Sequence, residues 1–154
     1  HLREKRFNIG DVLCESLAFQ VLSVMDSILT LIENLREQVK SYVEGEIDDA
    51  LISEFVGSTF NELDILSTHT FVDYSELESY YVSSICSKHV VIKGDGIVYC
   101  DLQWGSGSDM RNGIGASMST SFPYDFTIYS KLTDLKKMEL GNEGITVDTD
   151  SWYE

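Results

Sequence analysis

Apolar residues between positions 11 and 43 recur at spacings of three and four, which is the period of one helical stripe. The pattern predicts one long helix that begins at Asp11, with Asn8 or Asp11 as its cap, and ends at Val43. The stripe consists of Leu17, Val21, Met25, Ile28, Ile32, Leu35, Val39 and Tyr42, and it is widened by Leu22, Val24, Leu29 and Leu31.

A second, shorter helix is expected over residues 46–60, where apolar positions again gather on one face. Gly45 stands between the two helical patterns, at a place where glycine commonly ends a helix. The residues after it are rich in carboxylates, which favour the positive end of a helix dipole. These carboxylates are Glu46, Asp48 and Asp49. The sequence therefore predicts a helical hairpin within residues 1–62.

From Phe71 onward, β-branched and aromatic residues alternate with polar ones and are punctuated by glycine. Residues 80–106 are predicted to form two strands around the sequence KGDG, in which Asp95 and Gly96 supply a tight hairpin turn. One face of the second strand is expected to be buried. That face consists of Val98, Cys100, Leu102 and Trp104.

A further alternating run covers residues 116–132, and one or two short strands follow it. Pro123 is the only proline of the chain, which places the start of this run at a sheet edge or at a bulge. We therefore predict one α+β domain over residues 1–154, with the helical hairpin over 1–62 and a small, mainly antiparallel sheet over 63–154. The apolar side of the run consists of Phe122, Tyr124, Phe126 and Ile128.

The charge of the chain narrows its possible partners. Its 26 acidic residues outnumber 11 basic ones, which gives a formal charge of -15. Direct binding of nucleic acid is disfavoured, because Lys and Arg must neutralise the phosphates. Such a charge keeps a domain soluble, and it also suits an acidic face that meets a basic protein partner.

The cysteines and the start of the sequence give indications of the cellular compartment of the protein. Cys14, Cys86 and Cys100 are odd in number and lack CxxC spacing, which argues against disulfides and a structural zinc site and predicts a cytoplasmic protein. No run of 18 apolar residues and no signal-peptide core occur, so no membrane contact is expected. The chain begins with His1 and a charged stretch, so we expect a C-terminal fragment of a longer protein.

The stretch from 105 to 115 is rich in glycine and serine, but it lacks the following helix and the lysine of a phosphate-binding loop. One interpretation pairs Asp109 with Arg111 to stiffen a long connection. The other has Arg111, Ser106 and Ser108 bind an anion or a partner carboxylate.

The chain offers few groups for catalysis. His89 lies three residues after Cys86, so on a strand the two side chains point to opposite faces. A metal-dependent nuclease needs converging carboxylates and a nearby lysine, yet Asp101 in "DLQW" has no lysine after it. The remaining candidate side chains are scattered: His69, Glu62, Asp64 and Asp73. We therefore predict no catalytic residue, no metal ligand and no cofactor.

Residues 75–152 resemble the C-terminal accessory region of bacterial multidomain proteins from conflict and antiphage loci. Some of these proteins carry a PIN-like ribonuclease or another predicted nuclease upstream. The resemblance implies an accessory, sensing or assembly domain attached to an effector, and it transfers no catalytic residue. The positions that carry it are Trp104, Gly105, Ser106, Ser108, Asp109, Arg111, Ser121, Phe122 and Pro123.

Two hypotheses for function follow. The first is a non-catalytic interaction or regulatory domain that binds a second copy of itself, or a missing N-terminal catalytic domain, through the helix over 11–43. Its ligand or partner residues are Ser106, Ser108, Asp109 and Arg111, while Trp104, Gly105, Phe122 and Pro123 are structural. The second hypothesis is a small metal-dependent nuclease that uses the scattered carboxylates.

Overall fold

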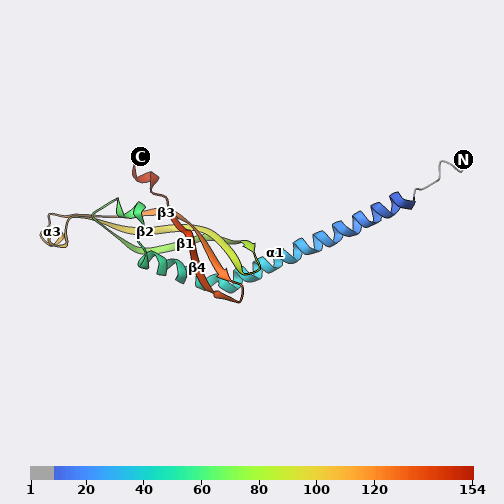
Figure 1. Cartoon of the computed structure of the whole chain (residues 1–154). Helices are drawn as coiled ribbons and strands as arrows, with labels where there is room; N and C mark the ends of the chain where they lie inside the picture. Colours follow the sequence, from blue (N-terminus) through green and yellow to red (C-terminus); the bar gives the residue numbers. More distant parts are fainter. Residues whose placement is uncertain (1–8) are drawn as a thin grey trace. The chain divides into compact units, whose positions relative to one another are not determined.

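The computed structural model describes the backbone from Ile9 to Glu154 and the side chains of residues 12–140 and 144–154 (Figure 1). A long helix is followed by a four-stranded antiparallel sheet, which confirms the α+β class. The contacts divide the chain into two units, of which the first ends at Val39 and the second is Lys40–Glu154. The elements are α1 (Ile9–Gly57), α2 (Asn61–Asp64), β1 (His69–Ile85), β2 (His89–Trp104), α3 (Gly107–Arg111), β3 (Ala116–Lys131), β4 (Asp134–Val147) and η1 (Asp150–Trp152).

The predicted helical hairpin is wrong, because α1 continues without a break from Ile9 to Gly57. Gly45 lies inside the helix, where glycine costs only about 1 kcal/mol relative to alanine. Apolar residues on both sides of Gly45 keep one helical period, and their burial favours continuation. Of the two predicted caps, Asp11 lies inside α1 and Asn8 lies outside the described residues.

In the first unit, α1 carries apolar side chains that remain exposed. Every side chain from Val12 to Leu35 is exposed, including Leu31 at 67% and Val24 at 58%. Within the described residues, α1 is the one helix long and apolar enough to cross a membrane, with a mean hydropathy of 1.6 over 18 residues. The sequence prediction missed this property because Glu15 and Asp26 interrupt the apolar run without lowering its mean hydropathy far.

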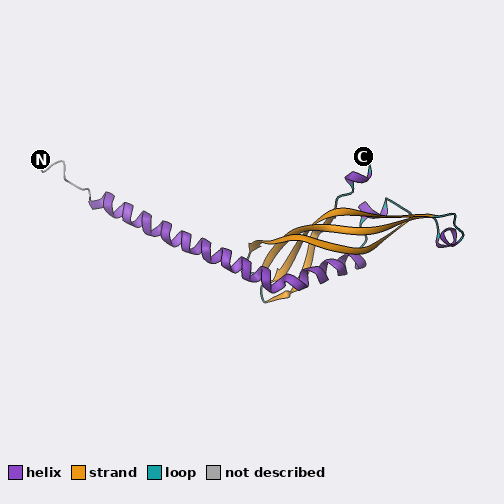
Figure 2. Cartoon of the chain, turned by 180° about the vertical axis from the view of Figure 1, so that it is seen from behind, coloured by secondary structure: helices purple, strands orange, loops and turns teal. Residues whose placement is uncertain are grey.

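The second unit is a meander in which each strand pairs with the next, in the order β1-β2-β3-β4 (Figure 2). Within this unit, α1 packs along one face of the sheet. The ring of Phe55 meets that of Tyr124 edge-on at 5.0 Å, and Glu46 forms an ion pair with Lys136 at 2.6 Å. The helix buries residues one turn apart: Val43, Ile47, Leu51 and Phe55.

The sheet face that receives α1 follows the predicted alternation. Val98, Cys100 and Leu102 of β2 are buried as expected, but Trp104 is only half-buried and stacks against Trp152 at 6.4 Å between ring centroids. The prediction of Trp104 as a buried anchor is therefore wrong. The apolar side of β3 is buried as predicted, through Phe122, Tyr124, Phe126 and Ile128.

The predicted hairpin turn at KGDG is also wrong, since β2 runs straight through Gly94 and Gly96. Neither glycine has a positive φ. Both lie against aromatic rings of β3, and a Cβ on Gly94 would stand 2.6 Å from the ring of Phe126. These glycines leave space for the aromatic rings of the core. The turn between β1 and β2 follows Ile85, and there the amide of Cys86 donates to the carbonyl of His89 at 2.8 Å.

Pro123 lies at an edge of the sheet, as predicted. β4 pairs with β3 only from Tyr124 onward, so the first half of β3 forms an edge of the sheet. The carbonyl of Pro123 accepts a hydrogen bond from the amide of Asp148 at 2.9 Å, just beyond the end of β4. A proline at an edge sacrifices no ladder hydrogen bond on its open side.

Candidate functional site

The face of the sheet opposite α1 carries the polar groups with the most chemistry. Tyr74 of β1 stacks on Tyr99 of β2 with ring centroids 4.3 Å apart and planes 15° apart. One register step further along β2, the carboxylate of Asp101 accepts a hydrogen bond from the hydroxyl of Ser119 on β3. Along β2, alternation brings Tyr99 and Asp101 to this side of the sheet, because Val98, Cys100 and Leu102 point into the core.

These residues surround a shallow cavity of about 470 Å³. Two carboxylates, Asp73 and Asp101, lie among hydroxyl groups, and no lysine, arginine or histidine lines it. The cavity is lined by Asp73, Tyr74, Tyr99, Cys100, Asp101, Ser119, Thr120 and Ser121. Such a lining favours hydrogen-bond donors and positively charged groups over phosphates.

Two of the residues that line the cavity, Tyr99 and Cys100, have a raised pKa. Partial burial raises the pKa of Tyr99, as does the charge of Glu76, whose carboxylate lies 3.4 Å from its hydroxyl oxygen. Burial raises the pKa of Cys100 to about 11, with a further contribution from Asp101. Because a thiol must lose its proton to be a nucleophile, Cys100 is an inert core residue at neutral pH.

A nuclease centre of the kind considered above needs converging carboxylates and a nearby lysine. Within residues 12–140 and 144–154, no group of three or more His, Cys, Asp or Glu side chains is placed to hold one metal ion. Asp73 and Asp101 supply two carboxylates, and no lysine stands beside them to position a water. Glu62 and Asp64 lie apart from this cavity, in α2.

The connection from 105 to 115 contains α3, a short helix that the sequence prediction missed. Ser106 caps it by accepting from the amide of Asp109 at 3.2 Å. In return, the carboxylate of Asp109 accepts from the Ser106 amide at 2.9 Å and hydroxyl at 2.8 Å. These hydrogen bonds lower the pKa of Asp109. The signal was present in the sequence, because serine followed three residues later by an acidic residue is a helix-start pattern.

The capping bonds decide how the four predicted ligand residues are used. Asp109 binds Ser106 and not Arg111, so the predicted pairing across the turn is wrong. Ser106 and Asp109 satisfy each other, while the exposed Arg111 lies in the last turn of α3. Gly105 has a φ of 105°, which allows the sharp entry into this helix. Of the predicted set, Arg111 and Ser108 remain candidate partner contacts.

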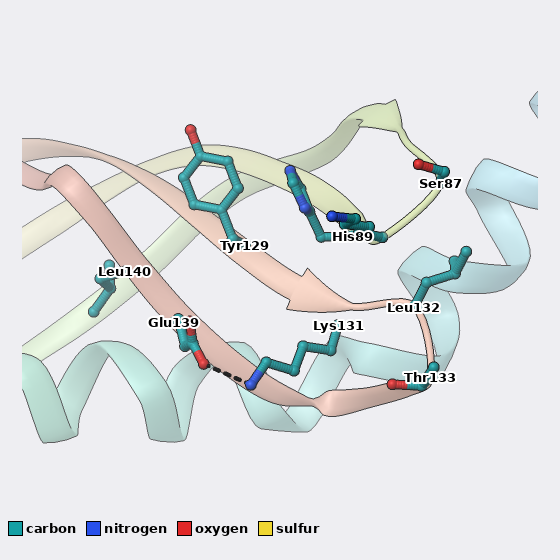
Figure 3. A pocket seen from close by; sticks show the side chains of 9 residues that line it. Ser87, His89, Tyr129, Lys131, Leu132, Thr133, Glu139 and Leu140 are labelled. Atoms are coloured by element: carbon teal, nitrogen blue, oxygen red, sulfur yellow. Dashed lines mark ion pairs between the residues drawn. The ribbon is translucent and has the colours of Figure 1, made fainter.

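A larger groove of about 750 Å³ lies where the β1-β2 and β3-β4 turns meet (Figure 3). His89 packs edge-on against Tyr129 at 5.3 Å, and Lys131 forms an ion pair with Glu139 at 3.0 Å. The turns are joined by a hydrogen bond from the Leu132 amide to the carbonyl of Lys88 at 3.0 Å. The lining of the groove carries two lysines, Lys88 and Lys131, and one carboxylate, Glu139.

Comparison with known protein families gives one finding. Residues 32–153 match the family model described as "Predicted pPIWI-associating nuclease", which covers more than half of the chain. The chain belongs to this family. No curated protein and no solved structure matches it. Membership links the chain to a predicted nuclease system, in agreement with that part of the resemblance, and it leaves the choice between a catalytic and a regulatory role to the chemistry of the site. The exposed apolar part of α1 lies mostly ahead of the matched residues.

Proposed function

We propose that this chain is a non-catalytic interaction domain of a nuclease-containing bacterial defence or toxin effector. In this proposal α1 is the docking element, and the sheet unit anchors it. The observation that carries the proposal is the exposure of every side chain from Val12 to Leu35, on a helix with a mean hydropathy of 1.6 over 18 residues. Apolar surface of this extent is typical of a protein interface.

The sheet supports a binding role in a second way. Its open face offers the Asp73 and Asp101 carboxylates, with hydroxyl groups around them and no nearby base or lysine. A basic side chain of a partner would find acceptors there, in keeping with the net charge of the chain. The family description names association with pPIWI, and we propose that such a protein, in the cytoplasm, is the partner of the effector to which this chain contributes.

The experiment compares binding with cleavage. The purified chain is incubated with single-stranded and duplex RNA and DNA in the presence of Mg²⁺ or Mn²⁺. In parallel, a pPIWI protein is tested for binding to the chain by calorimetry. We expect binding and no metal-dependent cleavage above the background of an Asp101→Asn variant. Cleavage by the wild-type chain that Asp101→Asn abolishes would overturn the non-catalytic role.

The alternative function is a small metal-dependent nuclease. The observations that favour it are the family description and the two carboxylates that share one cavity, Asp73 and Asp101. Under this alternative, Asp73→Asn and Asp101→Asn each remove activity, whereas Asp125→Asn on β3, outside that cavity, leaves it intact.

A further inference from the structure

The apolar residues of the exposed segment of α1 fit a regular heptad pattern. In heptads written abcdefg, position a begins at Cys14 and recurs every seven residues. The side chains at both core positions are apolar over successive heptads and exposed in this chain. They are Val21, Ile28 and Leu35 at a, and Leu17, Val24 and Leu31 at d. This is the seam by which helices associate side by side.

The seam is wider than that of a two-stranded coiled coil. The e positions are also apolar, with Ala18, Met25 and Ile32, and two b positions hold Leu22 and Leu29. An apolar face that adds e to a and d is the pattern of helices in a bundle, where each helix contacts more than one neighbour. A single partner helix would leave part of this face in water.

The charges of the segment fit identical neighbours. The g positions Gln20, Ser27 and Asn34 are uncharged, and so are the e positions. Among the acidic residues, Asp26 and Glu33 fall at f, away from the seam, and Glu15 falls at b in the first turn of the segment. Because e and g residues face the neighbouring helix, copies of this chain can associate in parallel without placing like charges opposite each other. The e and g positions therefore add no repulsion between copies of a chain whose net charge is -15.

A membrane fits the same segment less well. Helices that lie on anionic membranes carry Lys and Arg on their polar face. Between Val12 and Leu35 there is no basic residue, and the polar face carries Glu15, Asp26 and Glu33. For a helix that spans the bilayer, Asp26 would lie near the middle, where a carboxylate is costly.

We propose that α1 assembles more than two copies of this chain into a parallel helical bundle through residues 14–35. The proposal deepens the proposed function, on which it rests, by naming the partner of the docking helix as further copies of the same chain. The segment is about 33 Å long, and most of the stability of a helix in a protein comes from the packing of its apolar face. The bundle supplies that packing, and it gathers several sheet units and any attached effector domains into one assembly.

The first test is the mass of the full chain in solution, measured by light scattering across a concentration series. We expect a mass above twice the 17.4 kDa of one chain. Ile28→Asp at an a position should reduce the mass to that of a monomer. Phe19→Asp is the matched control, because Phe19 is 72% exposed at an f position, and it should leave the mass unchanged. A mass of one or two chains for the wild type would overturn the proposed bundle.

The second test asks whether the helices are parallel. Cys14 and Cys86 are the exposed cysteines, and Cys100 is buried. In a parallel bundle Cys14 residues of neighbouring copies meet at one level of the seam. Mild oxidation with copper phenanthroline should therefore cross-link Cys86→Ser into covalent pairs and leave Cys14→Ser uncross-linked. An assembly whose Cys86→Ser form does not cross-link would contradict the parallel arrangement.

A third experiment tests whether the exposed segment of α1 binds a membrane instead of other copies of the chain. The chain is floated with neutral phosphatidylcholine vesicles. We expect it to remain with the soluble fraction, whereas a monomer that floats with vesicles would overturn self-association in favour of a lipid surface. None of these outcomes depends on nucleic-acid cleavage, so a monomeric chain without nuclease activity would remove the bundle and leave the non-catalytic role intact.

Discussion

The two parts of α1 differ in burial although their apolar residues have a similar period. After Lys40 the helix buries Ile47, Leu51 and Phe55 against the sheet of its own chain. Before Val39 it carries an apolar face of similar period, and there Leu17 and Ile28 remain exposed. The spacing of apolar residues therefore predicts that a helix face is buried, but it does not show which chain buries it.

The largest expected effect comes from the covered part. Ile47→Ala should lower the free energy of unfolding of the sheet unit by about 2–5 kcal/mol, because it leaves a cavity in the core. Ile28→Ala in the exposed part should leave that unfolding transition unchanged. Trp104 and Trp152 both lie in the second unit, so urea titration followed by tryptophan fluorescence reports on it alone. Equal shifts for the two variants would abolish the distinction between the two parts of the helix.

The sheet surface beneath the covered part is the next target. A Cβ on Gly96 would stand 2.3 Å from the carbonyl oxygen of Glu76 and 2.7 Å from the ring of Tyr124, which contacts Phe55 of α1. Gly96→Ala should therefore cost about 1–3 kcal/mol of stability, as overpacking of a core does. The control is Gly107→Ala, whose Cβ meets nothing within 4 Å. Thermal unfolding that gave both variants the wild-type midpoint would contradict this packing.

Gly45 lies in the covered part of α1, and its replacement tests whether the helix is continuous. A Cβ there meets nothing within 4 Å, so Gly45→Ala should stabilise the chain by about 0.5–1 kcal/mol through its helix propensity. If α1 ended at Gly45 in a left-handed conformation, alanine would destabilise it instead. The sign of the change in the denaturant midpoint distinguishes the two cases.

The smallest effect is expected from the ion pair that links α1 to β4. The hydrogen bond and charge of Glu46 raise the pKa of Lys136 above its ordinary value of 10.5. A raised pKa means that the stabilisation is present at neutral pH and is lost as the pH rises through the folded value. Lys136→Met should lower the unfolding temperature at pH 7, and only slightly, because solvent screens this exposed pair. At strongly alkaline pH Lys136 is uncharged, so the substitution should have no such effect. A difference that grew with pH would contradict the assignment.

The sequence predicted the parts of the fold that depend on alternation. The burial of Val98 and Leu102 and the edge position of Pro123 follow from local pattern and backbone chemistry. The same reasoning failed at Gly45 and Gly94, because glycine has several structural uses. A glycine can end a helix, turn a chain or admit a neighbouring ring, and only the tertiary partner distinguishes these uses.

The candidate site was less predictable than the fold. Alternation placed Tyr99 and Asp101 on one face, yet it gave no sign that Tyr74 and Ser119 would join them from other strands. Those contacts depend on strand register, which the sequence does not state. The capping pair of Ser106 and Asp109 was visible as a pattern and was overlooked.

Amide hydrogen exchange along α1 tests the central claim most directly, because it compares both parts of one helix in one experiment. Exchange is measured at a low and a high concentration of the wild-type chain. We expect residues 43–55 to be protected equally at both concentrations, and residues 17–35 to gain protection as concentration rises. Fast exchange of residues 17–35 at every concentration would contradict the claim that further copies of the chain cover this part of the helix.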